Sequence, residues 1–243
     1  MSEPSPPEHR WHVKPIALSA AIIVLLVIGF LWYRNEVDVP DEVGDGTEFV
    51  TWVDRGLSEE IKVEFELRIT TLEAAISSNP ERDISQLLQL GNLKYTYGDL
   101  QGAKEQYEDI LFTHPKDAPA LENLGQTLRE MGDYEGAFAR WRAALNISPY
   151  EVTYLKLADL IEEQFPERQD EIQTLLEEAI ATLGQTPGLL KRLGEWYATN
   201  EQYDEAISHY KVAKQLDPDD ETIDELIDEV RAAKAQAAKE ERE

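Results

Sequence analysis

The first strong pattern in the chain is an uninterrupted apolar run near the N-terminus. Residues 16–33 read IALSAAIIVLLVIGFLWY, carry no charge, and include Ser19 as the one clearly polar residue. A helix of this length rises about 27 Å, which roughly matches a ~30 Å hydrocarbon core. Bulky residues follow the run where a signal peptide would need a small-residue cleavage site, so an uncleaved anchor is favoured. The pattern predicts a short tail over 1–15 and a transmembrane helix over 16–33.

The next pattern is polar and then amphipathic. Residues 34–57 are rich in acidic residues, proline and glycine, which predicts an extended linker. Ser58 is a suitable N-cap, and apolar residues then recur every three or four positions, which predicts a helix over 58–78 within a flanking segment 58–80. Four apolar residues interrupt the linker and are expected to dock on the domain that follows: Phe49, Val50, Trp52 and Val53.

Beyond this helix, the apolar pattern repeats with a period of 34 residues. Each set contains Leu-Gly, then a small residue and an aromatic residue, and finally a proline. Self-similarity of this length, in register, indicates a repeat architecture. The distance between the second and third matching sets leaves space for one degenerate unit. The matching sets are Leu90, Gly91, Ala103, Tyr107 and Pro115; Leu124, Gly125, Ala137, Trp141 and Pro149; and Leu193, Gly194, Ala206, Tyr210 and Pro218.

Each unit predicts a helix, a turn and a second helix. The small residues would let the paired helices approach closely, and the aromatic residues would fill the space between units. Gly98, Gly132 and Asn200 are expected to end first helices in the left-handed conformation. The predicted segments are repeats at 84–117, 118–150, 151–186 (degenerate, with a longer turn) and 187–220, and a C-terminal capping helix at 221–243.

This pattern resembles the tetratricopeptide repeat (TPR), whose consensus has Leu-Gly in the first helix and Ala, an aromatic residue, Ala and Pro in the second. Together with the apolar run, the resemblance implies an all-α fold: an N-terminal transmembrane helix followed by a right-handed α-solenoid of about four repeats plus flanking helices. It also implies a concave surface that is lined by the first helix of each unit and binds proteins or peptides.

The resemblance further implies which side chains face a ligand. Some relatives hold a peptide C-terminal carboxylate with lysines and asparagines, but Leu88 and Val152 stand where two of those lysines would be. Because two cations are missing, recognition of a free carboxylate is disfavoured. The residues at the ligand-facing positions are Asn92, Tyr95, Glu122, Asn123, Gln126, Arg129, Leu155, Lys156, Asp159, Glu162, Lys191, Arg192 and Glu195.

Charge narrows the possible partners and suggests an orientation. The 243-residue chain has a net charge of −26, with +1 in residues 1–34 and −27 in the rest, which argues against binding nucleic acid. Arg10 and Lys14 precede the apolar run and only Arg34 closely follows it. We therefore expect the N-terminus in the cytoplasm and the repeat domain outside it. The imbalance is small, so the opposite orientation stays open.

The sequence contains no catalytic or metal-binding pattern. Cysteine is absent, which excludes disulfides and cysteine-ligated metal sites. His9 and His12 lie in the tail, His114 lies at a repeat junction, and His209 lies on a second helix, where we expect it to face solvent. None of them is placed with carboxylates as a metal site. We expect no enzyme activity, no cofactor, no metal and no small-molecule substrate.

The sequence therefore predicts a non-catalytic, membrane-anchored scaffold or adaptor. It would bind a protein or peptide partner in its concave groove, on the extracytoplasmic (periplasmic) face of a bacterial membrane. Two alternatives stay open. The layout is similar to that of anchored TPR assembly factors in cytochrome c maturation and to envelope chaperone partners. The opposite orientation would suit a cytoplasm-facing receptor of the import-receptor type.

Overall fold

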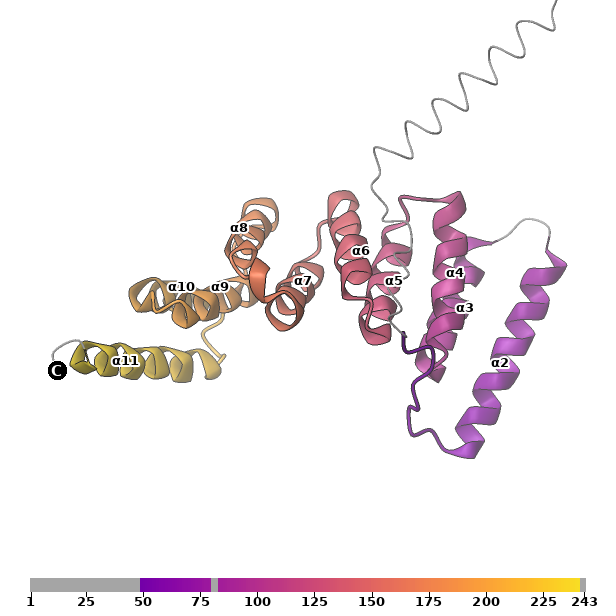
Figure 1. Ribbon diagram of the computed structural model, residues 1–243, viewed down its shortest axis with the longest axis horizontal. Helices are drawn as coiled ribbons and strands as arrows, with labels where there is room; N and C mark the ends of the chain where they lie inside the picture. Colours follow the sequence, from indigo (N-terminus) through magenta and orange to yellow (C-terminus); the bar gives the residue numbers. More distant parts are fainter. Residues whose placement is uncertain (1–48, 80–82, 241–243) are drawn as a thin grey trace, which may run out of the picture. The chain divides into compact units, whose positions relative to one another are not determined.

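The computed structural model describes residues 49–79 and 83–240, and this part of the chain is all-α (Figure 1). The predicted tail and transmembrane helix, and most of the predicted linker, lie outside these residues. Over the described ranges, no helix combines the length and the hydropathy needed to cross a membrane. The helices are α2 (Glu59–Ser78), α3 (Ile84–Tyr97), α4 (Leu100–Thr113), α5 (Ala118–Met131), α6 (Tyr134–Ile147), α7 (Glu151–Gln164), the 3-10 helix η1 (Pro166–Arg168), α8 (Glu171–Leu183), α9 (Pro187–Thr199), α10 (Tyr203–Leu216) and α11 (Thr222–Glu240).

Consecutive helices pack as antiparallel pairs that follow the 34-residue period. The pairs are α3 with α4, α5 with α6, α7 with α8, and α9 with α10, and each pair also packs on the next one along the chain. Helix α2 covers α3 at one end, and α11 covers α10 at the other (Figure 1). The two flanking helices therefore close the ends of a TPR-like solenoid core, as capping elements do in other repeat proteins.

A glycine packs against an aromatic ring inside each of the three close-matching pairs. A Cβ atom added to Gly91 would lie 2.6 Å from the Tyr107 ring, and one added to Gly194 would lie 2.5 Å from the Tyr210 ring. In the second pair, the same atom on Gly125 would lie 2.6 Å from the Trp141 ring. All three rings are buried. Since no larger side chain fits, the expectation that small residues allow close helix approach is confirmed.

Two of the three predicted left-handed turns are confirmed, and the third is wrong by one residue. Gly98 and Gly132 have φ values of 105° and 89°, whereas Asn200 has φ −91° and Glu201 has the positive value, 60°. Asn200 keeps a right-handed backbone because its main-chain N–H and its side-chain amide both donate to the carbonyl of Trp196, at 3.1 and 2.8 Å. The left-handed conformation therefore falls on the following residue, Glu201.

The longer turn of the third unit packs back on the second. Phe165, directly before the 3-10 helix of this turn, is buried, and its ring meets that of Phe138 edge to face, with centroids 6.1 Å apart. The Arg168 guanidinium lies over both rings, 3.9 Å from the Phe138 centroid and 4.9 Å from that of Phe165. Cation–π contacts of this kind add stability when they are partly shielded from water. The extra residues of this turn therefore strengthen the contact between the second and third units.

Residues 49–55 form an extended strap across the helix ends of the first two repeats. Val50 N–H donates to the Met131 carbonyl at 2.9 Å, Val53 N–H donates to the Gly98 carbonyl at 2.9 Å, and Gln101 N–H donates to the Thr51 carbonyl at 3.1 Å. The strap thus satisfies backbone groups that helices leave unpaired at their ends. The predicted docking of this segment is confirmed. However, Phe49, Val50 and Trp52 stay 40–51% exposed, so the backbone supplies much of the contact.

Gly98 and Gly132 form a matched pair that tests the strap. A Cβ on Gly98 would lie 2.0 Å from the Val53 carbonyl oxygen, whereas one on Gly132 would meet nothing within 4 Å. Gly132→Ala should cost about 1 kcal/mol of unfolding free energy, from left-handed strain alone. Gly98→Ala should cost at least about 2 kcal/mol, because the same strain is joined by the clash. Urea denaturation measures both, and amide exchange at Val53 should accelerate in Gly98→Ala only. Equal costs with unchanged exchange would contradict the docked strap.

Candidate ligand-binding surface

The predicted ligand-facing residues all lie on first helices of the pairs. Helix α3 carries Asn92 and Tyr95, and helix α5 carries Glu122, Asn123, Gln126 and Arg129. Helix α7 carries Leu155, Lys156, Asp159 and Glu162, and helix α9 carries Lys191, Arg192 and Glu195. Most of them form two chemically different areas: an uncharged pocket at the first two repeats and an ionic cluster at the last two.

The first area is a pocket of about 230 Å³ between α3, α4 and α5. It contains no ionisable group other than its two phenols. Four of its lining residues are predicted ligand-facing residues, while Thr96 and Tyr107 are not. Tyr107 was expected only to pack between units, but its hydroxyl end reaches the pocket. The pocket is lined by Asn92, Tyr95, Thr96, Tyr107, Asn123 and Gln126.

A hydrogen-bond network fixes how the two pocket asparagines point. The Asn92 Oδ1 atom accepts from the Tyr107 hydroxyl at 2.7 Å and from the Asn123 Nδ2 atom at 2.8 Å. Burial raises the pKa of Tyr107, so its phenol stays protonated and remains a donor at neutral pH. Among the described residues, the Asn92 amide nitrogen and the Asn123 amide oxygen have no partner. The pocket therefore presents one oriented donor beside one oriented acceptor.

The strap contacts one residue of the pocket lining, Tyr95. Arg55 donates to the Tyr95 carbonyl at 3.2 Å and to the Glu130 carboxylate at 2.7 Å, and its guanidinium lies 5.1 Å from the Tyr95 ring centroid. The Tyr95 hydroxyl donates to the same carboxylate. Burial, followed by this carboxylate, raises the pKa of Tyr95 to about 12. Sequence analysis missed Arg55 and Glu130, because neither lies at a ligand-facing repeat position.

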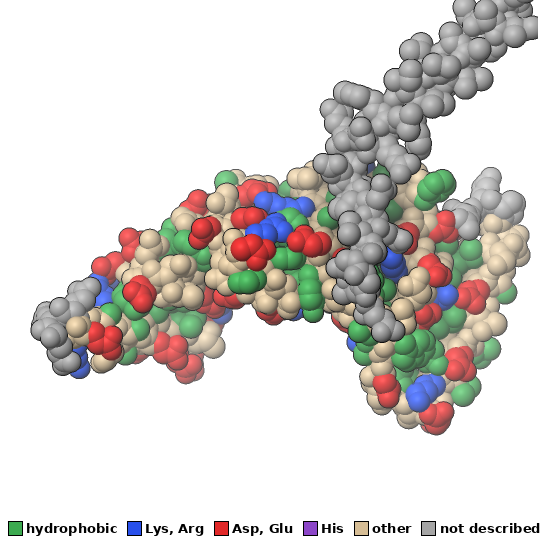
Figure 2. Space-filling view, viewed as in Figure 1, with side chains coloured by type: hydrophobic (Ala, Val, Ile, Leu, Met, Phe, Trp, Pro, Cys, Tyr) green, Lys and Arg blue, Asp and Glu red, His purple; other side chains and the backbone are tan. Residues whose placement is uncertain are grey.

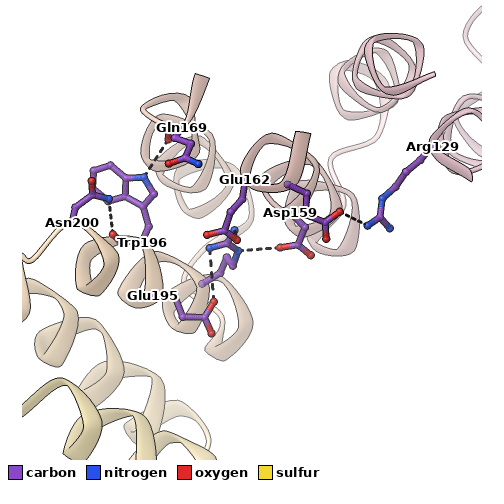
Figure 3. Close-up of polar contacts among 9 residues, drawn as sticks. Arg129, Asp159, Glu162, Gln169, Glu195, Trp196 and Asn200 are labelled. Carbon is purple, nitrogen blue, oxygen red and sulfur yellow. Dashed lines mark hydrogen bonds and ion pairs between the residues drawn. The ribbon is translucent and has the colours of Figure 1, made fainter. Parts of the chain in front are cut away.

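The second area is centred on a buried arginine of α9 that pairs with carboxylates of α7. Figure 3 shows the carboxylates of this area, Asp159, Glu162 and Glu195. Arg192 is 8% exposed and donates to Asp159 at 3.1 Å and to Glu162 at 2.8 Å, and it lies 3.8 Å from Glu195. Burial raises the pKa of Glu195, and the nearby arginine partly offsets that effect. Arg192, one of the predicted ligand-facing residues, is surrounded by three carboxylates, and its pairs with Asp159 and Glu162 join the third and fourth units.

Several other predicted residues also have partners within the domain. The Glu122 carboxylate accepts from the Thr153 hydroxyl, and Arg129 pairs with Glu163 at 2.8 Å. The Lys156 amine lies 5.8 Å from the Trp141 ring centroid. Lys191 donates to Asp220 at 2.8 Å and, with Thr222, lowers the pKa of that carboxyl to about 2. These contacts join neighbouring units, so a ligand would have to compete for the same groups.

The described residues contain no group of three or more histidines, cysteines or carboxylates that could hold a metal ion. His209 was expected to face solvent, but it stacks on Tyr197 with centroids 5.1 Å apart, and burial lowers its pKa. The stacking follows from the packing of α10 on α9, which the helix position of this residue alone did not reveal.

Acidic side chains are spread over the visible face of the helices (Figure 2).

Comparisons with known proteins identify the repeats. Residues 88–151 and 189–223 match family models described as tetratricopeptide repeat. A search of curated protein sequences finds no match to the chain. Residues 152–188, between the two matched segments, include most of the unit that the sequence shows as degenerate.

Solved structures share the fold at low sequence identity. MamA aligns with a TM-score of 0.56 and 20% identity, over 69% of this chain and 96% of that protein. YrrB, described as a TPR protein with an unusual peptide-binding site, gives 0.53 and 19%, over 68% and 84%. Yeast Tom70 gives 0.55 and 19%, over 73% of this chain but only 38% of Tom70. At these identities, the likeness shows a common fold.

Arg192 and Arg129 form a matched pair for testing the ionic area. Arg192→Met would leave Asp159, Glu162 and Glu195 together without their cation and should cost about 1–3 kcal/mol of unfolding free energy. Arg129→Met removes a more exposed ion pair and should cost less than about 1 kcal/mol. Because the raised pKa of Glu195 would rise further without the arginine, the Arg192→Met penalty should shrink as pH falls from 7 to 4. Urea denaturation at both pH values tests this, and equal penalties for the two variants would contradict it.

Proposed function

Because the chain carries tetratricopeptide repeats, we propose that it is a non-catalytic scaffold that binds a protein or peptide partner on its first helices, α3, α5, α7 and α9. The TPR fold is a protein-interaction fold, which supports the general class. The proposal places the main recognition site at the pocket between the first two repeats. The observation that carries it is the fixed orientation of Asn92 and Asn123.

These two side chains match the backbone of an extended peptide. The Asn92 amide nitrogen can donate to a peptide carbonyl, and the Asn123 amide oxygen can accept from a peptide N–H. Such recognition does not depend on the peptide side chain. Leu88 and Val152 occupy the positions of two lysines that would hold a C-terminal carboxylate, so an internal segment of the partner suits the pocket better than a chain end. YrrB is itself described as having a peptide-binding site.

We further propose that residues 16–33 anchor the scaffold in a bacterial membrane, with the repeats on the extracytoplasmic face. The support is the uncharged run and the position of Arg10 and Lys14 before it. Anchoring restricts the domain to the membrane surface and raises its local concentration, so a modest groove affinity would suffice. An assembly factor of the cytochrome c maturation or envelope chaperone kind is a narrower version of this proposal. The reverse orientation, with a cytoplasm-facing receptor, is the alternative.

Asn92→Asp tests the peptide-binding role without removing the network. The carboxylate still accepts from Tyr107 and Asn123, but the outward N–H donor is lost. Binding to the best peptide of an immobilised array of randomised 12-residue peptides should fall about tenfold. Asn146→Asp is the matched control, since this exposed residue on α6 gives the same charge change outside the pocket. Equal affinity of the two variants, or no binding by the wild type, would overturn the proposal.

The anchor is tested by fractionating bacterial cells that express the full chain and a chain beginning at residue 35. The full chain should sediment with membranes and resist high-salt extraction, whereas the shorter chain should remain in the supernatant. Protease added to spheroplasts should degrade the repeats of the full chain, because the proposed orientation places them outside. Membrane attachment with complete protection from protease would favour the cytoplasm-facing alternative. A full chain in the supernatant would refute the anchor.

A further inference from the structure

The strap lies outside the repeats, yet its last side chain reaches the proposed binding surface. Arg55 is the residue that makes this connection. Its guanidinium contacts α3 through the Tyr95 ring and carbonyl, and contacts α5 through Glu130. Tyr95 also lines the pocket between the first two repeats. A segment that precedes every repeat therefore contributes to the surroundings of the pocket.

Arg55 balances a charge that the repeats alone would leave beside the pocket. Glu130 and Arg55 are 26% and 25% exposed, so both are partly shielded from water. The Glu130 carboxylate accepts from the Tyr95 hydroxyl, which brings it next to the pocket lining. Without the guanidinium, this carboxylate would be a net negative charge at the pocket edge. With it, the pair is neutral, and the amide and phenol groups of the pocket decide what binds.

We propose that the strap is part of the ligand-binding site and that Arg55 is a positioning residue that sets its charge preference. The inference rests on the proposed function at this pocket and adds the class of ligand. The preferred ligand segment is uncharged where it faces Tyr95 and Gln126, with neither a basic nor an acidic side chain favoured. The guanidinium acts through its neighbours, since it neutralises Glu130 and packs against the Tyr95 ring.

The contact between Arg55 and Tyr95 also couples ligand binding to docking of the strap. A ligand that packs on Tyr95 stabilises the ring position that Arg55 holds, and the docked strap in turn favours that ligand. Such coupling is reciprocal by thermodynamic necessity. The strap amides of Val50 and Val53, which bond to helix-end carbonyls, should exchange more slowly with solvent when the pocket is filled.

The experiment uses the full chain and the best uncharged binder from the 12-residue peptide array, remade with a lysine or a glutamate at each position in turn. For the peptide position that faces Tyr95, the wild type should bind the lysine-substituted and the glutamate-substituted peptide with nearly equal affinity. Arg55→Met should shift the ratio of these two affinities toward the lysine peptide by about threefold or more. Glu130→Gln should shift it toward glutamate, and the double variant should restore the wild-type ratio. Arg68→Met, on exposed α2, is the control and should leave the ratio unchanged.

The readout is a ratio of affinities, which a uniform loss of stability would not move. Glu130→Gln leaves the strap sequence intact and gives an independent test if Arg55→Met does not fold. If wild type binds a peptide but neither variant shifts the ratio, the role of Arg55 is overturned and the proposed function stands. If wild type binds no peptide, both are overturned. Unchanged exchange at Val50 and Val53 on peptide binding would likewise overturn the coupling.

Discussion

The contact between a glycine on the first helix and an aromatic ring on the second sets the distance between the paired helices. It occurs three times, with Gly91 against Tyr107, Gly125 against Trp141 and Gly194 against Tyr210. Removing one buried ring of this size costs about 3–5 kcal/mol of unfolding free energy, which is a large part of what a single repeat contributes. Because this packing commits one side of the first helix, the other side of that helix is free to vary. That side carries the pocket and the ionic area.

The two areas differ in how their polar side chains are paired within the domain. In the first two repeats, the Asn92 amide oxygen accepts from both Asn123 and Tyr107, and the proposed peptide contacts use the other amide atom of each asparagine. In the last two, Arg192 is surrounded by carboxylates of two helices and mainly holds the units together. Equivalent helix positions therefore make different contacts in the two areas.

The sequence predicted the features that are periodic or local. The repeat period gave the helix pairs, the small-against-aromatic packing, the turn glycines and the longer third turn. Ser58 was expected to cap α2, and its hydroxyl does accept from Ile61 N–H. The features that it did not predict lie where contacts join residues that no pattern connects. Arg55 meets Glu130 across 75 positions, Arg192 is buried by carboxylates from another helix, and the reversal at Glu201 depends on the side chain of Asn200. Composition and spacing do not encode such contacts, because each depends on how separate helices pack.

The strap has a mechanical consequence. It is the first part of the described chain, so tension applied from the N-terminal side loads its hydrogen bonds to Met131, Gly98 and Gln101 before it reaches any helix. Peeling the strap away would withdraw Arg55 from Glu130 and leave that carboxylate without its cation. The pocket would then change from neutral to negative. With the role proposed for Arg55, a pull on the chain would change which peptides the domain prefers.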